Sequence, residues 1–492
     1  MKVTQPTKAP GPFEVTADGR GMTGRAGLGL IAQVADRIGL TAGLGRVLGR
    51  CRPWRKHDPG KVVRDLILTL ADGGDALRHV KVLEGQPELF GQIASAATAN
   101  RTISALAENE LVIEQLAEAM RTTRARVWAA GGAPPAVAAA EAAEQTGEHE
   151  RVWRLGLDID ATLLGCQNDD RDGLRRAAAT YKRTFGTYPL MAYLDRGDGL
   201  REALVSLHRP GNAGSNTAAD HVEVFQMALS TLPTLPGQVR LVVRTDAAGA
   251  TQDFLHYLRQ TGAEFSVGFA IGEGVRKAIR ALKDADWVPA LRQDGQEREG
   301  AAVAEITHSP WINLDGYPDR SRLLVRREPL HPGAQQRLFD IPGARFTAFL
   351  TDQPDPPGDL AAYAPPDHDP LDDALTGDAP LGDALAGDSA ASGGAGGLAG
   401  LDLAHRKHAQ VEDGIRGAKD TGARNLPCET FERNAVWLQL VMMAQTLMAW
   451  TQALTLDGQL RKARAAIVAL QAVAHPGQGQ PVGTQDAVAY PA

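Results

Sequence analysis

From residue 151 onward, the chain alternates apolar runs of strand length with amphipathic segments of helix length. Turn residues bound the extended runs, and Gly197 and Gly199 lie between two of them. Such a mixture builds sheets covered by helices, so it predicts an α/β layer. We expect strands within 152–164, 187–199, 200–210 and 239–249, and helices within 221–232 and 251–262.

The first part of the chain has a different, mainly helical texture. Apolar residues recur at helical spacing throughout 26–130. Asp58 followed by Pro59 is a favourable helix start, with Asp58 as the cap and Pro59 in the first turn. Gly73 and Gly74 are expected to end that helix. These signals predict a helical domain before the α/β layer.

Composition changes again after residue 262. Strand-like runs separated by turn signals predict a β-rich insertion. An acidic stretch follows, and its repeat LDDALTGD and LGDALAGD indicates a flexible linker. Helical texture then resumes near residue 403. The expected domains are a helical N-terminal domain at 1–147 that ends in a linker at 131–147, a first core part at 148–262, the β-rich insertion at 263–352, the acidic linker at 353–403, a helical second core part at 404–472 and a disordered tail at 473–492.

Charge is distributed unevenly along the chain. The formal net charge is −7, which is unfavourable for a protein that binds nucleic acid. However, residues 353–403 hold ten Asp and no Lys or Arg, whereas residues 1–64 hold twelve Lys and Arg against four Asp and Glu. A basic N-terminal region suits contact with nucleic acid. A solvated arm explains the same charge equally well.

The cysteines and the longest apolar stretch exclude several classes of protein. Cys51, Cys166 and Cys428 are far apart and form no CxxC pair, so we expect neither disulfides nor structural zinc, which suits the cytoplasm. No apolar leader is expected at the N-terminus. Glutamines interrupt the apolar stretch 435–456, so we expect a buried core helix and no membrane contact.

Two acidic residues end strand-like runs, and a third lies in a later helix. Asp160 ends RLGLDID, Asp246 ends VRLVVRTD, and Glu412 lies within HRKHAQVEDGIRGAK. Such strand ends are where α/β sheets place their chemistry, and three converging carboxylates can hold two divalent ions such as Mg²⁺. Taken singly, an Asp at a strand end is more commonly a loop cap. Asp158 competes with Asp160, because strand alternation puts both on one face.

Charged residues surround Glu412 at helical spacing. Intervals of three or four residues predict one shared face for His405, His408, Glu412, Arg416 and Lys419. A basic face around one carboxylate suits a helix that touches both metal and phosphate. A solvated face with an ion pair between Glu412 and Arg416 is the plainer alternative, and the pattern alone favours it. The apolar stripe of the helix is expected to comprise Val411, Ile415 and Ala418.

Nine short motifs follow one another along the chain. They are HDPGKVVRDLILTLADGGDALRHV, QPELFGQIAS, LDIDAT, YKRTFGTYPL, RPGNAGSNTAADH, VRTDAAGAT, FSVGF, LHPGAQQRL and HRKHAQVEDGIRGAKDTGARNLP. Together they resemble the DDE transposases of the insertion-sequence thirteen-eighty group, within the broader insertion-sequence-four type. The resemblance covers roughly residues 15–460. Each motif alone is weak, but their common order is specific.

The resemblance implies a ribonuclease-H-like catalytic core, interrupted by the β-rich insertion and preceded by the helical domain. It implies an enzyme that cuts double-stranded DNA at the inverted-repeat ends of a mobile element and joins them to target DNA, using two Mg²⁺ or Mn²⁺ ions. A homodimer in the synaptic complex and a cytoplasmic, nucleoid-associated location are implied as well. Asp160, Asp246 and Glu412 match the three acids of the group, which favours Asp160 over Asp158 by analogy. Lys419 matches a basic residue that contacts DNA phosphate.

The chain also departs from the group that it resembles. His405 and His408 stand where the wider superfamily places Tyr and Arg, so phosphate contact is also expected from Arg406 or Arg416. The acidic repeat at 371–390 is an expansion, and the C-terminal end is altered. A degenerate or domesticated copy that binds DNA without cutting it is therefore the main alternative. A ribonuclease-H-like nuclease without strand transfer is another.

Overall fold

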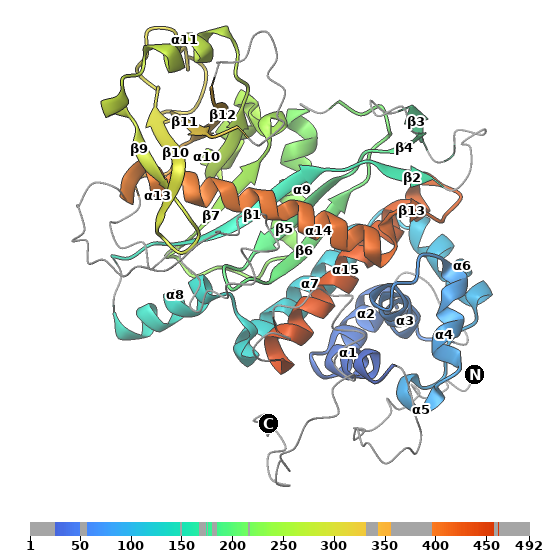
Figure 1. The fold of residues 1–492 in the computed structure, drawn as a ribbon. Helices are drawn as coiled ribbons and strands as arrows, with labels where there is room; N and C mark the ends of the chain where they lie inside the picture. Colours follow the sequence, from blue (N-terminus) through green and yellow to red (C-terminus); the bar gives the residue numbers. More distant parts are fainter. Residues whose placement is uncertain are drawn as a thin grey trace.

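The computed structural model combines one large mixed sheet with many helices (Figure 1). This confirms the α/β class expected from the sequence. The residues that the structure describes are 25–49, 57–147, 150–166, 174, 176–179, 185–214, 217–330, 343–355, 396–456 and 461.

The large sheet has nine strands, and the order of its strands is not their order in the sequence. Across the sheet they are β6 (Arg201–Leu207), β5 (Leu190–Asp195), β1 (Trp153–Ala161), β7 (Val239–Thr245), β8 (Glu264–Phe269), β12 (Arg345–Thr351), β11 (Arg322–Glu328), β10 (Glu297–Glu305) and β9 (Val288–Leu291). The expected strands in the α/β layer are all present, and Gly197 and Gly199 turn the chain between β5 and β6 with positive φ.

Strand direction divides this sheet into regions. β6, β5 and β1 are antiparallel neighbours, whereas β1, β7 and β8 run parallel. Beyond β8, every neighbouring pair is antiparallel. The strands expected in the insertion are therefore present, and the pairing of β12 with β8 makes them a continuation of the same sheet.

A smaller sheet and three helices complete this part of the chain. The four strands of the smaller sheet run in the order β13 (Asn425–Leu426), β2 (Leu164–Cys166), β4 (Phe185–Thr187) and β3 (Ala178–Ala179). The helices are α9 (Ala218–Ser230), α10 (Gln252–Gln260) and α11 (Glu273–Ala281). α9 packs on β5 and β6 and α10 on β8, so the two helices expected in the α/β layer are confirmed.

The N-terminal region is helical, as expected. Its α-helices are α1 (Ala26–Arg37), α2 (Leu40–Leu48), α3 (Pro59–Ala71), α4 (Lys81–Glu84), α5 (Pro87–Phe90), α6 (Ala96–Ala107) and α7 (Val112–Val127). The Asp58 side chain caps α3 by accepting a hydrogen bond from the Gly60 amide at 2.7 Å, and Pro59 occupies the first turn. The helix ends at Ala71, two residues before Gly73, whose φ is +82°.

The expectation of a linker at 131–147 is wrong. Most of this segment forms α8 (Pro135–Thr146), which packs against β1 and β7. Alanine is the strongest helix former, and Pro135 is favourable in the first turn. Val137, Ala140 and Ala143 are buried and recur every three residues, so the helix has an apolar face although its two faces differ little in hydrophobicity.

The segment before Glu412 also differs from expectation. α13 (Gly396–Arg406) begins inside the predicted acidic linker at 353–403, because leucines and alanines at its start pack against β9 and β10. A 3₁₀ turn at Lys407–Gln410 joins it to α14 (Val411–Ala418). Figure 1 shows the two helices as one orange rod lying across the sheet. Residues 356–395, which hold the acidic repeat, lie outside the described residues.

The apolar stretch 435–456 is a buried core helix, as expected. α15 (Phe431–Thr455) packs against β6 and against α1, α3, α6 and α7. A single hydrophobic core therefore runs from the N-terminal helices through α15 into the large sheet. Among the described helices, none is long and apolar enough to cross a membrane.

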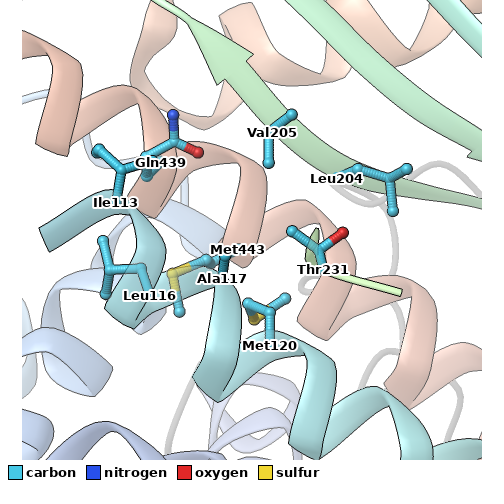
Figure 2. A pocket seen from close by; sticks show the side chains of 9 residues that line it. All are labelled: Ile113, Leu116, Ala117, Met120, Leu204, Val205, Thr231, Gln439 and Met443. Carbon is cyan, nitrogen blue, oxygen red and sulfur yellow. The ribbon is translucent and has the colours of Figure 1, made fainter. Parts of the chain in front are cut away.

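A small cavity lies where the N-terminal helices meet the sheet. Figure 2 shows side chains from α7, β6 and α15 around it. Its lining is almost entirely apolar, and the amide of Gln439 is occupied by hydrogen bonds to the backbone of Ser206. Convergent polar groups are what distinguish a ligand site from a packing defect. We therefore assign this cavity to the core and look for function elsewhere.

Candidate catalytic site

Asp160 and Asp246 occupy equivalent positions on neighbouring parallel strands. Ile159 of β1 is in register with Thr245 of β7, so the two aspartates come next on each strand. Adjacent strands lie about 4.8 Å apart. The two carboxylates therefore project from the same end of the sheet, on the face that also carries Asp158.

Glu412 reaches this end of the sheet from the first turn of α14. Val411 and Ile415 are buried on either side of it in the sequence, so α14 is fixed while Glu412 is exposed. α14 packs on β1 and β5. The predicted apolar stripe of Val411, Ile415 and Ala418 is confirmed.

The three acids influence one another electrostatically. The pKa of the Asp160 carboxyl is raised to about 6, by burial first and also by the negative charges of Asp246 and Glu412. The charge of His408 and the Ala161 amide, which donates to Asp160 Oδ1 at 2.7 Å, act in the opposite direction but do not compensate. Asp160 is thus a half-buried acid facing two others, an arrangement that favours a bound cation or proton.

Asp158 has a different environment, although it lies on the same face. Its side chain is fully buried, and Arg244 donates to both oxygens, from Nε and Nη2, at 2.8 Å each. His408 Nδ1 lies 3.0 Å from Asp158 Oδ1. Burial alone would raise the pKa of Asp158, but these two positive partners hold it below its ordinary value. Asp158 is therefore already neutralised within the protein, whereas Asp160 is not.

The donor set of the three acids fits a hard divalent cation. All the available ligand atoms are carboxylate oxygens, which Mg²⁺ and Mn²⁺ prefer. Among the described residues, however, no three His, Cys, Asp or Glu side chains are gathered tightly enough to hold an ion.

Two glycines allow the backbone around the acids to pack closely. A Cβ on Gly268 of β8 would lie 2.8 Å from the Ala247 amide nitrogen, beside Asp246. A Cβ on Gly414, two residues after Glu412, would lie 2.9 Å from Cε1 of the buried Tyr193 ring. Neither neighbour is the free end of a flexible side chain. Each glycine thus permits an approach that places one of the acids.

The expectation of a single basic face around Glu412 is wrong, because the 3₁₀ turn changes the helical phase. His405 is buried, its ring stacks on Phe349 at 4.3 Å, and Ser266 Oγ lies 2.9 Å from its Nδ1. Burial holds the pKa of His405 well below its ordinary value. Arg406 pairs with Asp402 at 2.9 Å. The side chains of His405 and Arg406 already interact with other residues of the protein, so we do not propose them as contacts for DNA phosphate.

The remaining basic candidates differ in accessibility. His408 is half-buried and contacts Asp158. Arg416 is exposed, with 53% of its side-chain surface accessible, and pairs with Asp413 at 2.6 Å. Lys419 follows directly after α14 and is half-buried. Arg416 and Lys419 therefore remain the candidates near Glu412 for contact with an anionic ligand.

Sequence reasoning missed the residues that support the acids. Arg244 lies two residues before Asp246, just as Asp158 lies two before Asp160, and alternation places both pairs on one face. A buried Asp is usually paired, but the register that brings Arg244 beside Asp158 becomes visible only in the folded sheet. The contacts of Gly268 and Gly414 had no sequence signal beyond the glycines themselves.

One family model matches most of the chain. Residues 6–351 match the family described as "Transposase DDE domain group 1", a range that includes Asp160 and Asp246 but not Glu412. No curated protein matches the chain. Among solved structures, a piggyBac transposase in a synaptic complex with hairpin DNA is similar over 92% of this chain and 81% of that chain, with 9% sequence identity and a TM-score of 0.40. A likeness of that degree supports no conclusion about mechanism.

Proposed function

Because the chain belongs to the family of transposases with a group 1 DDE domain, we propose that it cleaves and joins DNA at the inverted-repeat ends of an insertion sequence. The reaction is a polynucleotidyl transfer that depends on divalent metal ions. Asp160, Asp246 and Glu412 are its metal-binding and catalytic residues. The substrates are the double-stranded ends of the element and a target DNA.

One observation carries the assignment of the site. Asp160 is a half-buried carboxyl whose pKa is raised to about 6, by burial first and then by Asp246 and Glu412. Strongly perturbed acids gather at functional sites more often than elsewhere. The neighbouring Asp158 is fully paired, so the protein shows that it can neutralise a carboxylate here. Among the described residues, no Lys or Arg pairs with any of the three acids, which supports a site for Mg²⁺ or Mn²⁺.

Each residue of the site has a proposed role. Asp160, Asp246 and Glu412 would hold two ions, which when bound supply Lewis-acid activation of the attacking oxygen and stabilise the leaving oxygen. The Ala161 and Ala248 amides orient the two aspartates by donating to them at 2.7 and 2.9 Å. Residues 416 and 419 lie beyond Glu412 and would contact DNA phosphate, positioning the scissile bond in line with the attacking group.

The motifs and the strand order support finer proposals. Two antiparallel strands beside β1, followed by the parallel strands β7 and β8, support a ribonuclease-H-like core. The motif series supports membership of the insertion-sequence thirteen-eighty group. We assign recognition of the DNA ends to the basic N-terminal region, within 1–147, and propose a homodimer in the synaptic complex. A cytoplasmic, nucleoid-associated location follows from that function.

The test of this function compares binding with cleavage on one DNA. Wild-type protein and the Asp246→Asn variant are incubated with DNA carrying the element's own ends, at two salt concentrations, with and without Mg²⁺. We expect the variant to bind the ends as the wild type does, with the same steep dependence on salt. Cleavage by the variant should fall by at least about 10³-fold, because the substitution removes a charge that the metal requires.

Two outcomes would contradict this function. Undiminished cleavage by Asp246→Asn would remove Asp246 from the site. Binding without any cleavage by the wild type would instead support a domesticated copy that recognises DNA ends but no longer cuts them.

A further inference from the structure

We propose that Arg244 is a positioning residue that fixes the helix carrying Glu412 over the strand ends carrying Asp160 and Asp246. The inference rests on the proposed function and concerns how the three acids are held together. Arg244 acts on the site indirectly, through the residues that it contacts, because its guanidinium is buried, with 4% of the side chain exposed.

The residues that dock this helix form one row across the sheet. Asp158 of β1 is in register with Tyr193 of β5 on one side and with Arg244 of β7 on the other. Arg244 is in turn in register with Ser266 of β8. We call Tyr193, Asp158, Arg244 and Ser266 the docking row. Side chains at one register level of adjacent strands point to the same face.

Every member of the docking row contacts the helical rod of α13 and α14. The contacts are Ser266 Oγ with His405 Nδ1 at 2.9 Å, Arg244 Nη1 with the Ala404 carbonyl at 3.2 Å, Asp158 Oδ1 with His408 Nδ1 at 3.0 Å, and the Tyr193 ring with the backbone at Gly414. The rod thus crosses β8, β7, β1 and β5 at the level of the docking row. Glu412 lies between the last two of these contacts in the sequence.

The acids occupy the next level of the sheet on the same face. Asp160 and Asp246 each lie two residues beyond a docking-row residue of their own strand. Two residues of strand correspond to about 6.6 Å. The docking row therefore determines both the height of the helix above the sheet and its distance from the strand ends.

Arg244 is the member of the row that joins the most elements. Besides both oxygens of Asp158 and the Ala404 carbonyl, it donates from Nη2 to Asp195 Oδ2 at 2.7 Å. One guanidinium thus connects β7, β1, β5 and α13. Arg201 of β6 also holds the 3₁₀ turn in place, by donating hydrogen bonds to the carbonyl and side-chain oxygens of Gln410.

A buried ion network of this kind is suited to fixing geometry. Apolar residues of similar volume often stabilise a core as well as buried ion pairs do, so ion pairs in cores contribute mainly through the geometry that they specify. The planar fork of arginine imposes directions that a flexible lysine or an apolar side chain would not. At Arg244 those directions align β7 and β1, which lead to Asp246 and Asp160, with α13, which continues through the 3₁₀ turn into the helix that carries Glu412.

The test measures binding of Mn²⁺ alone to the full-length protein, by the loss of the paramagnetic signal of free Mn²⁺. The variants are Arg244→Gln, His408→Gln and, as a control, Arg154→Gln. Arg154 forms an equally bidentate pair with Glu264 in the same sheet, at 2.6 and 3.0 Å, but near the start of β1, away from the acids. Asp246→Asn serves as the reference for loss of a ligand.

We expect Arg244→Gln to weaken Mn²⁺ binding at least tenfold and His408→Gln to weaken it severalfold. Arg154→Gln should bind Mn²⁺ with an affinity within twofold of that of the wild type, even if its melting temperature falls as much as that of Arg244→Gln. Arg244→Lys should recover part of the affinity, because an ammonium still neutralises Asp158 but cannot bridge all three partners. A merely structural role for Arg244 would predict no difference between the Arg244 and Arg154 variants of matched stability.

The outcomes separate this inference from the function on which it rests. If the wild type binds no Mn²⁺, or Asp246→Asn binds it as tightly, the proposed function fails and the positioning role with it. If Asp246→Asn loses binding but Arg244→Gln and His408→Gln keep wild-type affinity, the positioning role alone is overturned. Should Arg244→Gln not fold, His408→Gln decides the question, because it removes a single contact with the docking row.

Discussion

Two carboxylates in this molecule, the fully buried Glu202 and the half-buried Asp160, have opposite environments. Glu202 of β6 is fully buried and accepts hydrogen bonds from Arg124, Arg196 and the Trp450 indole at 2.7 to 2.9 Å. Burial alone would raise the pKa of Glu202, but the two arginines hold it below its ordinary value. Asp160 instead faces other acids, and its pKa is raised to about 6.

This contrast separates a structural charge from a functional one. The Glu202 group joins α7, β6 and α15, and so ties the N-terminal helices to the sheet with a charge that the protein neutralises itself. Among the described residues, no Lys or Arg pairs with Asp160, Asp246 or Glu412, so these acids form an excess of negative charge at the end of the sheet. Such an excess of negative charge destabilises the folded state unless a cation binds there from solution. Removing the charge from Glu202 should therefore destabilise the fold, whereas removing it from Asp160 should stabilise the fold.

The largest effect is expected from Glu202→Gln. The substitution leaves Arg124 fully buried without a carboxylate and Arg196 with Asp198 alone, so it should lower the free energy of unfolding by about 3 to 5 kcal/mol. Denaturant titration measures the loss. Asp420→Asn, which breaks an exposed pair with Arg424, is the control and should cost less than about 0.5 kcal/mol. Equal losses in the two variants would mean that the Glu202 group is not a structural anchor.

A smaller loss of stability, with a clear loss of activity, is expected from Gly414→Ala. The added methyl would lie 2.9 Å from the Tyr193 ring, so α14 must move away from β5, at about 1 to 3 kcal/mol. Displacing Glu412 by about 1 Å could lower cleavage by about 10²-fold. Gly417→Ala in the same helix meets only Gln445 at 3.6 Å and should leave both quantities nearly unchanged. Parallel behaviour of the two variants would argue against close packing at Gly414.

In contrast to these two substitutions, Asp160→Asn is expected to stabilise the fold. At pH 7.5 without metal, the wild type carries an ionised Asp160 whose burial and neighbours disfavour the charge, so removing that charge should stabilise the fold by about 1 to 3 kcal/mol. The raised pKa implies that this gain is fully present above pH 6 and shrinks as pH falls toward 4, because Asp160 of the folded wild type then becomes protonated while the unfolded chain is still about half ionised. Denaturation at the two pH values checks it. Destabilisation at pH 7.5 would contradict the proposed repulsion.

The smallest effect concerns contact with DNA. Arg416 is exposed near Glu412, so Arg416→Ala should weaken DNA binding by about 1 kcal/mol and reduce the salt dependence by about one counterion. Arg240→Ala, at the opposite end of β7, is the matched control. Affinity measured across salt concentrations distinguishes them. An identical salt dependence in both variants would leave Arg416 outside the DNA contact.

Much of the fold followed from local sequence patterns. Alternation and helical periodicity located the strands around Asp160 and Asp246, the cap at Asp58 and the buried helix α15, because each depends on residues close in sequence. α8 was missed because an Ala-rich helix lacks a strong apolar contrast until the sheet supplies its partner. The early start of α13 depends likewise on packing against β9.

The candidate site was only partly accessible to the same reasoning. The strand ends and the later helix indicated Asp160, Asp246 and Glu412 as candidate acids, but strand alternation could not decide between Asp158 and Asp160. That decision needed the buried partner Arg244, which lies 86 residues from Asp158 in the sequence. Helical spacing also misplaced His405, because a 3₁₀ turn between it and Glu412 alters the phase of the helix.

The central claim is that Asp160, Asp246 and Glu412, at the end of the sheet, bind a divalent cation. The most direct measurement is the Mn²⁺-induced rise in melting temperature of the wild type, Asp160→Asn and Asp246→Asn between pH 5 and 8. We predict that Mn²⁺ stabilises the wild type at pH 7 to 8, because a ligand that binds only the folded state adds its binding free energy to stability. This stabilisation should fade below about pH 6, where a proton occupies Asp160, and should be absent from both variants. Equal stabilisation of all three proteins by Mn²⁺ would contradict the claim.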